Sequence, residues 1–182
     1  MVPGAPRSRA GGRVKIIGID LSLRSTGIAG DGWADRIGPP AKLLGIGRLR
    51  YIRSAVLDYA RPADLVVLEG PSYGSAGAGQ HERAGCWWLV YDAVAAIDIP
   101  VAVVPPACRA RYACGRGNAS KDEVLTAAVR RYPDVDITNN DEADALILAA
   151  MGADHIGQPW VTVPALHRKG LDGCAWPEGI AA

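Results

Sequence analysis

Residues 14–29 read VKIIGIDLSLRSTGIA, an apolar β-branched run that delivers one carboxylate to its end and then turns back. This composition favours a buried central strand, because Val and Ile pack well on both faces of a pleated sheet. Asp20 ends the run, and a Ser-Thr-Gly turn then leads to a second short strand around Ile28. Asp20 is therefore either a functional carboxylate or an ordinary cap of the turn that follows it.

A second apolar run, LVVLEG at residues 65–70, repeats this pattern and ends in Glu69. Strands whose like ends lie together would bring Asp20 and Glu69 close to each other. Two close negative charges need a cation or a proton between them. The two runs thus predict a pair of carboxylates at one edge of a sheet, unless Glu69 simply lies at a solvated strand end.

A helix that carries two more acids is predicted by residues 139–150, NNDEADALILAA. Asn139 with Glu142 gives a capping arrangement, and the Ala and Leu residues continue a good helix. Asp141 and Asp144 are three residues apart, so they share one face near the N-terminus of the helix. The helix dipole favours ionised carboxylates there, although acids in a first turn often do no more than complement that dipole.

Four carboxylates without any Cys or His ligand make up the candidate site: Asp20, Glu69, Asp141 and Asp144. Hard carboxylate oxygens suit Mg²⁺ or Mn²⁺. Two such ions can activate a water and stabilise the leaving 3′ oxygen in phosphodiester hydrolysis. The set therefore indicates a metal-dependent phosphodiesterase with two ions per site.

Basic residues gather in segments that lack acids, notably residues 99–121, which carry Arg109, Arg111, Arg116 and Lys121. Within the same stretch, Ser120 and Glu123 form a capping box that starts a helix running to about residue 132. A helix N-terminus beside Lys121 and Arg116 is an anion site, or else ordinary capping with a solvated lysine. The charge distribution is that of a phosphate footprint.

The composition is that of an ordinary soluble domain, with 182 residues, 49% hydrophobic residues and a net charge of +1. No apolar run is long enough to span a bilayer, and the four cysteines lack the spacing of a zinc site or a disulfide framework. Reduced thiols in a cytoplasmic protein are the simplest account. We expect a flexible basic arm at residues 1–13, one nuclease domain at 14–154, and a tail at 155–182 pinned by Trp160 and Trp176.

The remaining pattern predicts a loop at residues 31–42, a strand at 43–49, a short helix at 50–60 and a strand at 99–104 that Pro105 ends. The glycine-rich loop 71–79 carries Tyr73, which would either stack on a base or anchor the loop. A long helix at 80–98 is apolar nearly all round. Its aromatic surface at Trp87, Trp88 or Tyr91 suits a partner subunit, or the helix is simply a central one inside the domain.

These motifs, in order, resemble the RuvC family of Holliday-junction resolvases, and most closely the RuvC-like proteins of actinobacterial phages. The residues are GIDLSLRSTG at 18–27, LEG at 68–70, QHERAG at 80–85 after the glycine-rich loop, GRGNASKDEV at 115–124 and DEADAL at 141–146. The resemblance runs from about residue 14 to 150. It implies an RNase H-like α/β fold, a five-stranded mixed sheet flanked by helices.

Carried over by position, the resemblance makes the four carboxylates the metal-binding catalytic acids and Lys121 the basic residue that supports catalysis. Tyr73 falls in the loop where the family places an aromatic wedge, one residue from the expected spacing. At the position of the family's second functional lysine, this sequence has no lysine. Arg109 and Arg111 flank that position and are expected to contact phosphate, with Arg116 nearby. The family acts as a homodimer, for which the helix beginning near Gln80 would supply the interface.

We therefore expect a Mg²⁺- or Mn²⁺-dependent endonuclease for Holliday junctions in the cytoplasm, that of the host cell if a phage encodes it. A broader branch or flap nuclease is the nearest alternative. A non-catalytic junction-binding scaffold is the non-enzymatic one. An RNase H fits less well because the loop after Glu69 and the basic segment follow RuvC, and an actin-like kinase needs a second half that 182 residues do not provide.

Overall fold

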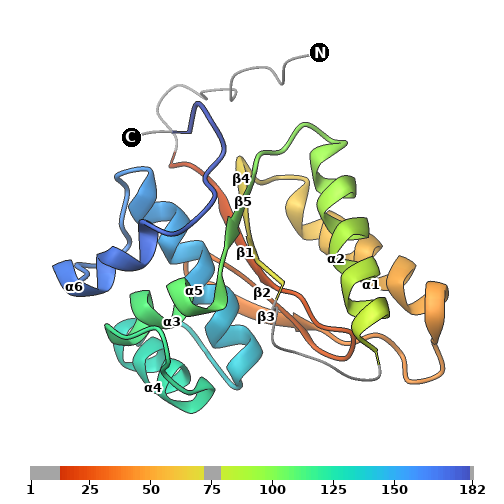
Figure 1. Cartoon of the computed structure of the whole chain (residues 1–182), viewed down its shortest axis with the longest axis horizontal. Helices are drawn as coiled ribbons and strands as arrows, with labels where there is room; N and C mark the ends of the chain where they lie inside the picture. Colours follow the sequence, from red (N-terminus) through yellow and green to blue (C-terminus); the bar gives the residue numbers. More distant parts are fainter. Residues whose placement is uncertain (1–12, 72–78, 181–182) are drawn as a thin grey trace.

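The computed structural model describes residues 13–71 and 79–180 (Figure 1). Tyr73 and all of the expected arm except Arg13 lie outside the described residues. Within the described part, no helix is both long and apolar enough to cross a lipid bilayer.

A five-stranded mixed sheet forms the centre of the protein, which confirms the expected α/β fold class. Its strands lie in the order β3-β2-β1-β4-β5. The strands are β1 (Ile16–Asp20), β2 (Thr26–Gly30), β3 (Trp33–Ile37), β4 (Leu65–Glu69) and β5 (Val101–Val104). β1, β2 and β3 form an antiparallel meander, whereas β4 and β5 run parallel to β1.

Helices cover both faces of the sheet, as Figure 1 shows. On one face lie α1 (Gly45–Ala60) and α2 (Gln80–Ala95), which share a hydrophobic core with side chains of β1 and β4. The other face carries the central helix α5 (Asn140–His155), with α3 (Pro106–Cys114) and α4 (Lys121–Arg131) packed beside it. A short helix α6 (Ala165–Arg168) and a 3-10 turn η1 (Lys169–Leu171) follow on that second face.

The third strand is not where the sequence analysis put it. Residues 33–37 form β3, and the predicted strand at 43–49 instead contains the start of α1. Gly30 pairs with Trp33 across a two-residue Asp-Gly loop, and Gly32 has a φ of 79°. This dipeptide is a strong hairpin signal because the turn requires positive φ. Leu49 and Ile52 are buried three residues apart, a helical spacing. This spacing explains why residues 45–60 form a helix rather than a strand.

Helix α3 was not predicted, because Pro105 and Pro106 were interpreted only as the end of a strand. Pro106 is the first residue of the helix, a position where proline's missing N–H costs nothing and its fixed φ suits the helix. The capping box of α4 is present as predicted: the Ser120 side chain accepts from the Glu123 N–H and the Glu123 carboxylate accepts from the Ser120 N–H.

The tail packs against the domain. The backbone of Ala175 pairs with Val103 of β5 through two hydrogen bonds of 2.9 Å. Trp176 stacks on His155 at the end of α5, with 4.0 Å between ring centroids, and Trp160 meets Tyr132 edge to face. The tail therefore extends the layer formed by α3, α4 and α5, while the expected division of the chain at residue 154 stays a prediction.

Candidate active site

The two strand-end acids stand side by side. β1 and β4 are parallel neighbours with Ile19 opposite Leu68, so the next residues, Asp20 and Glu69, lie at the same edge of the sheet. Asp20 is buried, and that burial raises its pKa well above the ordinary value. The negative charge of the adjacent Glu69 raises the pKa of Asp20 further.

Helix α5 brings the third acid to this edge because two glycines let it approach the sheet closely. A Cβ at Gly18 would lie 2.1 Å from the carbonyl oxygen of Ala145, and one at Gly27 would lie 1.9 Å from that of Asp141. Asp144, in the second turn of α5, is completely buried. Burial is the main reason that its pKa rises to about 6, with Arg109 opposing the rise and Asp20 adding to it.

The other two acids of this helix have different environments. Asp141 is partly exposed, and its Oδ1 lies 3.9 Å from the Lys121 Nζ. Glu142 points away from the site. Its carboxylate accepts hydrogen bonds from the Thr138 N–H and the Asn139 side-chain amide. Asp141 and Asp144 therefore share the face of α5 that meets Lys121, as their spacing predicts.

Lys121 is the first residue of α4, and the Ser120 capping box fixes the start of that helix. Its Nζ lies 3.5 Å from the Asp144 Oδ2. Partial burial lowers the pKa of Lys121, but the charges of Asp20, Asp144 and Asp141 outweigh this effect and the net shift is upward. Lys121 is thus a cation at the rim of the acid cluster.

Arg109 occupies a place that the sequence analysis did not foresee. Its side chain is buried, its Nε donates to the Glu69 Oε1 over 2.8 Å, and its Nη1 pairs with the Asp144 Oδ1. Burial lowers the pKa of Arg109, and the charges of Glu69 and Asp144 more than offset that effect. The guanidinium of Arg109 lies between two of the candidate catalytic acids, and the DNA contact expected of Arg109 stays a prediction.

The positions of these side chains bear on whether the acid cluster can hold a metal ion. Within residues 13–71 and 79–180, no three His, Cys, Asp or Glu side chains lie close enough together to hold a metal ion. The donor chemistry nevertheless fits a hard divalent cation. Asp20 and Glu69 are adjacent carboxylates, and the buried Asp144 Oδ2 accepts no hydrogen bond within the described residues, although the Lys121 Nζ lies 3.5 Å from it. The four-carboxylate metal site stays a prediction, with Arg109 now part of its surroundings.

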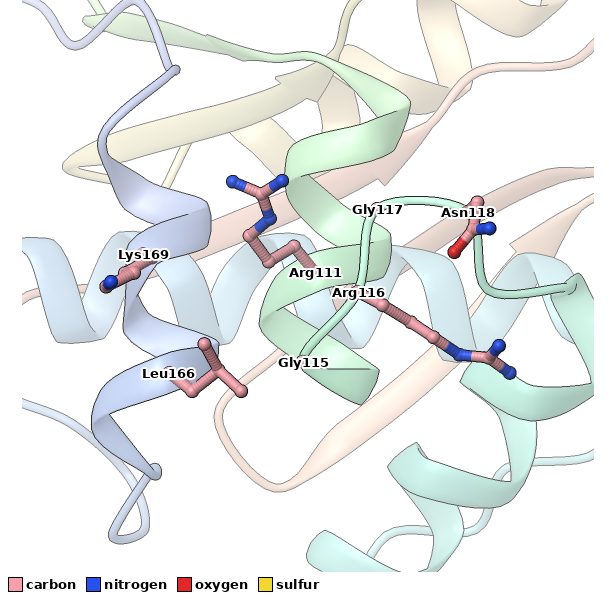
Figure 2. Close-up of a pocket in the computed structure, with 7 residues that line it drawn as sticks. All are labelled: Arg111, Gly115, Arg116, Gly117, Asn118, Leu166 and Lys169. Carbon is pink, nitrogen blue, oxygen red and sulfur yellow. The ribbon is translucent and has the colours of Figure 1, made fainter.

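Two of the predicted DNA contacts, Arg111 and Arg116, lie outside the acid cluster. Arg111 is on the exposed side of α3, two residues from Arg109. Arg116 is exposed in the loop that follows and forms an ion pair with Glu123. Both line a shallow hollow beside the tail, drawn in Figure 2. No sequence pattern predicts that tail residues share this hollow, because the tail carries no motif.

Comparisons with known proteins agree with this architecture. No protein-family model and no curated protein matches the sequence. Among solved structures, RuvC of Thermus thermophilus is similar, with a TM-score of 0.61 at 16% sequence identity over 83% of this chain and 100% of that one. The T. thermophilus RuvC in complex with a Holliday junction substrate gives a TM-score of 0.61 at 18% identity, over 84% of this chain and 100% of that one. At these identities the likeness concerns the fold, and the chain has a RuvC-like, RNase H-like α/β fold.

Proposed function

We propose that the protein is a metal-dependent endonuclease that cuts the phosphodiester backbone of four-way DNA junctions. The observation that carries the proposal is the convergence of Asp20, Glu69 and Asp144, from three separate segments, at one edge of a RuvC-like sheet. Burying carboxylates is costly. Burial raises the pKa of Asp20 and of Asp144, and acids whose pKa is shifted in this way are candidates for a functional site.

The chemistry follows from the donor set. A pair of bound Mg²⁺ or Mn²⁺ ions would supply Lewis acidity to the attacking water and to the leaving 3′ oxygen. Asp20 and Glu69 would hold the cations, with Asp144 and Asp141 completing the set from α5. Each carboxylate must be ionised to do so, which the raised pKa values of Asp20 and Asp144 oppose until a cation is present.

Lys121 is suited to contact the scissile phosphate. It stands at the N-terminus of α4, where unpaired backbone N–H groups and the helix dipole favour anions. Its Nζ faces both Asp141 and Asp144. A phosphate placed there would neutralise the ammonium group on one side while the acids do so on the other.

Cutting a junction in two strands calls for two copies of this site, so we propose a homodimer. The exposed aromatic face of α2 supports it: Trp88 is 63% exposed and contacts Trp87 and Tyr91. Large exposed apolar side chains of this kind mark interaction surfaces when they gather in a patch. The similar T. thermophilus protein binds a Holliday junction, which supports junction DNA as the substrate.

One observation favours the non-catalytic scaffold as a second candidate. Arg109 already compensates the charges of Glu69 and Asp144, so the acid cluster is electrically satisfied in part without any metal. A protein of this kind could bind junctions through its basic segments alone.

The test compares the wild-type protein with Asp20→Asn on a labelled four-way junction, a flap and a linear duplex, with Mg²⁺ or Mn²⁺. Paired symmetric nicks on the junction alone, lost in the variant while junction binding in EDTA is kept, are the expected result. Comparable cutting of the flap would make the protein a general branch nuclease. Junction binding without any cutting would show that the protein is a non-catalytic junction-binding scaffold.

A further inference from the structure

A hollow of about 570 Å³ lies where α3, the loop after it and the tail meet (Figure 2). We call it the tail pocket. Helix α3 supplies Arg111, and the loop supplies residues 115–118. The tail supplies Leu166 and Lys169. Figure 2 shows the Arg111 guanidinium in the space between α3 and the tail.

The tail pocket is positively charged. Three cations line it, Arg111, Arg116 and Lys169, and none of its lining residues is acidic. Arg116 forms an ion pair with Glu123 outside the pocket. Within the described residues, Arg111 and Lys169 are exposed and make no ion pair. Two free cations in a concavity indicate an anionic ligand.

Lys169 is held at the pocket by tight packing. The next residue, Gly170, is buried against α3, where a Cβ would lie 2.6 Å from the Cys108 carbonyl oxygen and 2.9 Å from the Tyr112 nitrogen. The residue before it, Arg168, pairs with the buried Asp154 of α5 over 2.9 Å. The backbone that carries Lys169 is therefore fixed on both sides, while its exposed side chain is free to turn toward a ligand.

The pocket and the acid cluster are connected through α3 and the loop. The side chain of Arg109 points from one side of α3 toward Glu69 and Asp144, whereas that of Arg111 points from another side toward the tail. The same loop that lines the pocket continues into Lys121. A DNA strand bound at the acid cluster could therefore continue past α3 to the pocket.

We propose that the tail pocket binds a backbone phosphate of the DNA substrate, away from the cut, through Arg111 and Lys169. The proposal rests on the proposed function, because it takes the ligand to be the DNA substrate of the acid cluster. Such a contact positions the strand and reads no base sequence. It gives the tail a role in substrate binding.

The first experiment measures junction affinity in EDTA across a range of salt concentrations. Lys169→Ala and Arg111→Ala should each weaken binding roughly fivefold and lower the slope of log affinity against log salt by about one, since each removes one phosphate contact. Lys42→Ala is the matched control: it removes an exposed lysine from the loop before α1, outside the pocket, and should keep the wild-type affinity and slope.

A second experiment locates the phosphate. Neutral methylphosphonate linkages are placed one at a time along the cut strand. One position away from the cut should weaken wild-type binding but have little effect on Lys169→Ala, because the partner charge is already gone. Inorganic phosphate is tested separately through its effect on the melting temperature of each protein.

The outcomes separate the two proposals. If the wild-type protein fails to bind junction DNA, the proposed function is wrong, and so is the proposal that the pocket binds DNA. If the wild type binds but Lys169→Ala and Arg111→Ala bind equally well, or Lys42→Ala is as damaging, the pocket proposal alone is overturned. It is also overturned if inorganic phosphate stabilises the wild type through Lys169 while DNA affinity is unchanged in the variant, which would identify a small-anion site.

Discussion

Arg109 places a positive charge inside a cluster of acids that would otherwise repel one another. Its guanidinium contacts Glu69 and Asp144 and lies near enough to Asp20 for their charges to interact. In the metal-free protein it therefore does part of what a divalent cation would do there. A cation that binds between these carboxylates must compete with Arg109 for their oxygens.

Replacing Arg109 with glutamine tests this competition. Arg109→Gln leaves the buried Asp144 and the partly buried Glu69 without their partner, and breaking a buried ion pair typically costs about 3–5 kcal/mol of stability. Because the competitor is gone, Mg²⁺ should raise the melting temperature of the variant more than that of the wild type. Calorimetric titration should likewise give a tighter Mg²⁺ affinity. Arg111→Gln, two residues away on the exposed side of α3, is the matched control and should behave as wild type in both measurements. An unchanged Mg²⁺ response in Arg109→Gln would show that any metal binds elsewhere.

The raised pKa of Asp144 predicts how stability depends on pH without metal. A carboxyl group with a pKa of about 6 in the folded protein holds its proton more tightly than in the unfolded chain. Its stabilising contribution is complete below the ordinary pKa and is lost as the pH rises through 6. In EDTA, the free energy of unfolding should fall by about 1 kcal/mol between about pH 5 and about pH 7.

Urea denaturation at several pH values measures this slope. Asp144→Asn should flatten it, because an amide does not titrate, whereas Asp134→Asn, at an exposed acid after α4, should keep it. If Asp144→Asn kept the wild-type dependence of the unfolding free energy on pH, another group would be responsible for the titration. Asp20 is the nearest candidate for that group.

The elements that build the site differ in how far the sequence predicts them. The β1 and β4 runs and the caps of α4 and α5 are local signals, so they identify the strand-end acids and the first turns that carry Lys121, Asp141 and Asp144. The contacts of Arg109 with Glu69 and Asp144 are not predictable without helix α3, for which Pro106 at the first helical position is the available signal. The place of Lys169 depends on how the tail packs on α3, a long-range contact that no local pattern encodes.

The close approach of α5 to β1 is the contact that brings the acids together. Gly18→Ala should destabilise the protein by about 2 kcal/mol, because its Cβ would meet the backbone of α5 2.1 Å away. Pushing α5 outward also moves Asp144 from Asp20, so cleavage should fall more than junction affinity does. Gly38→Ala is the control: its Cβ would have no neighbour within 4 Å, and it should change stability by less than about 0.5 kcal/mol. Equal stability of the two variants would mean that α5 tolerates the displacement.

At the scale of the whole molecule, the two helical layers present different surfaces. The layer of α3, α4, α5 and the tail carries the acid cluster's lysine and the tail pocket, so it offers charge to a phosphate backbone. The layer of α1 and α2 carries most of the exposed large apolar side chains of the described residues, among them Leu44, Ile46 and Trp88. If DNA binds one layer, the other remains available for a second copy of the chain.

Trp88→Glu tests that assignment. A charge placed in an apolar dimer interface should shift the protein from dimer to monomer in sedimentation velocity, and should convert paired junction cleavage into single nicks by separating the two sites. Val129→Glu is the matched control, since Val129 is an exposed apolar residue on α4, and it should leave the dimer intact. Dissociation by Val129→Glu but not by Trp88→Glu would move the interface to the α4 side. A wild-type protein that stays monomeric at every concentration would leave each molecule with one site, so that paired cuts would require two independent binding events.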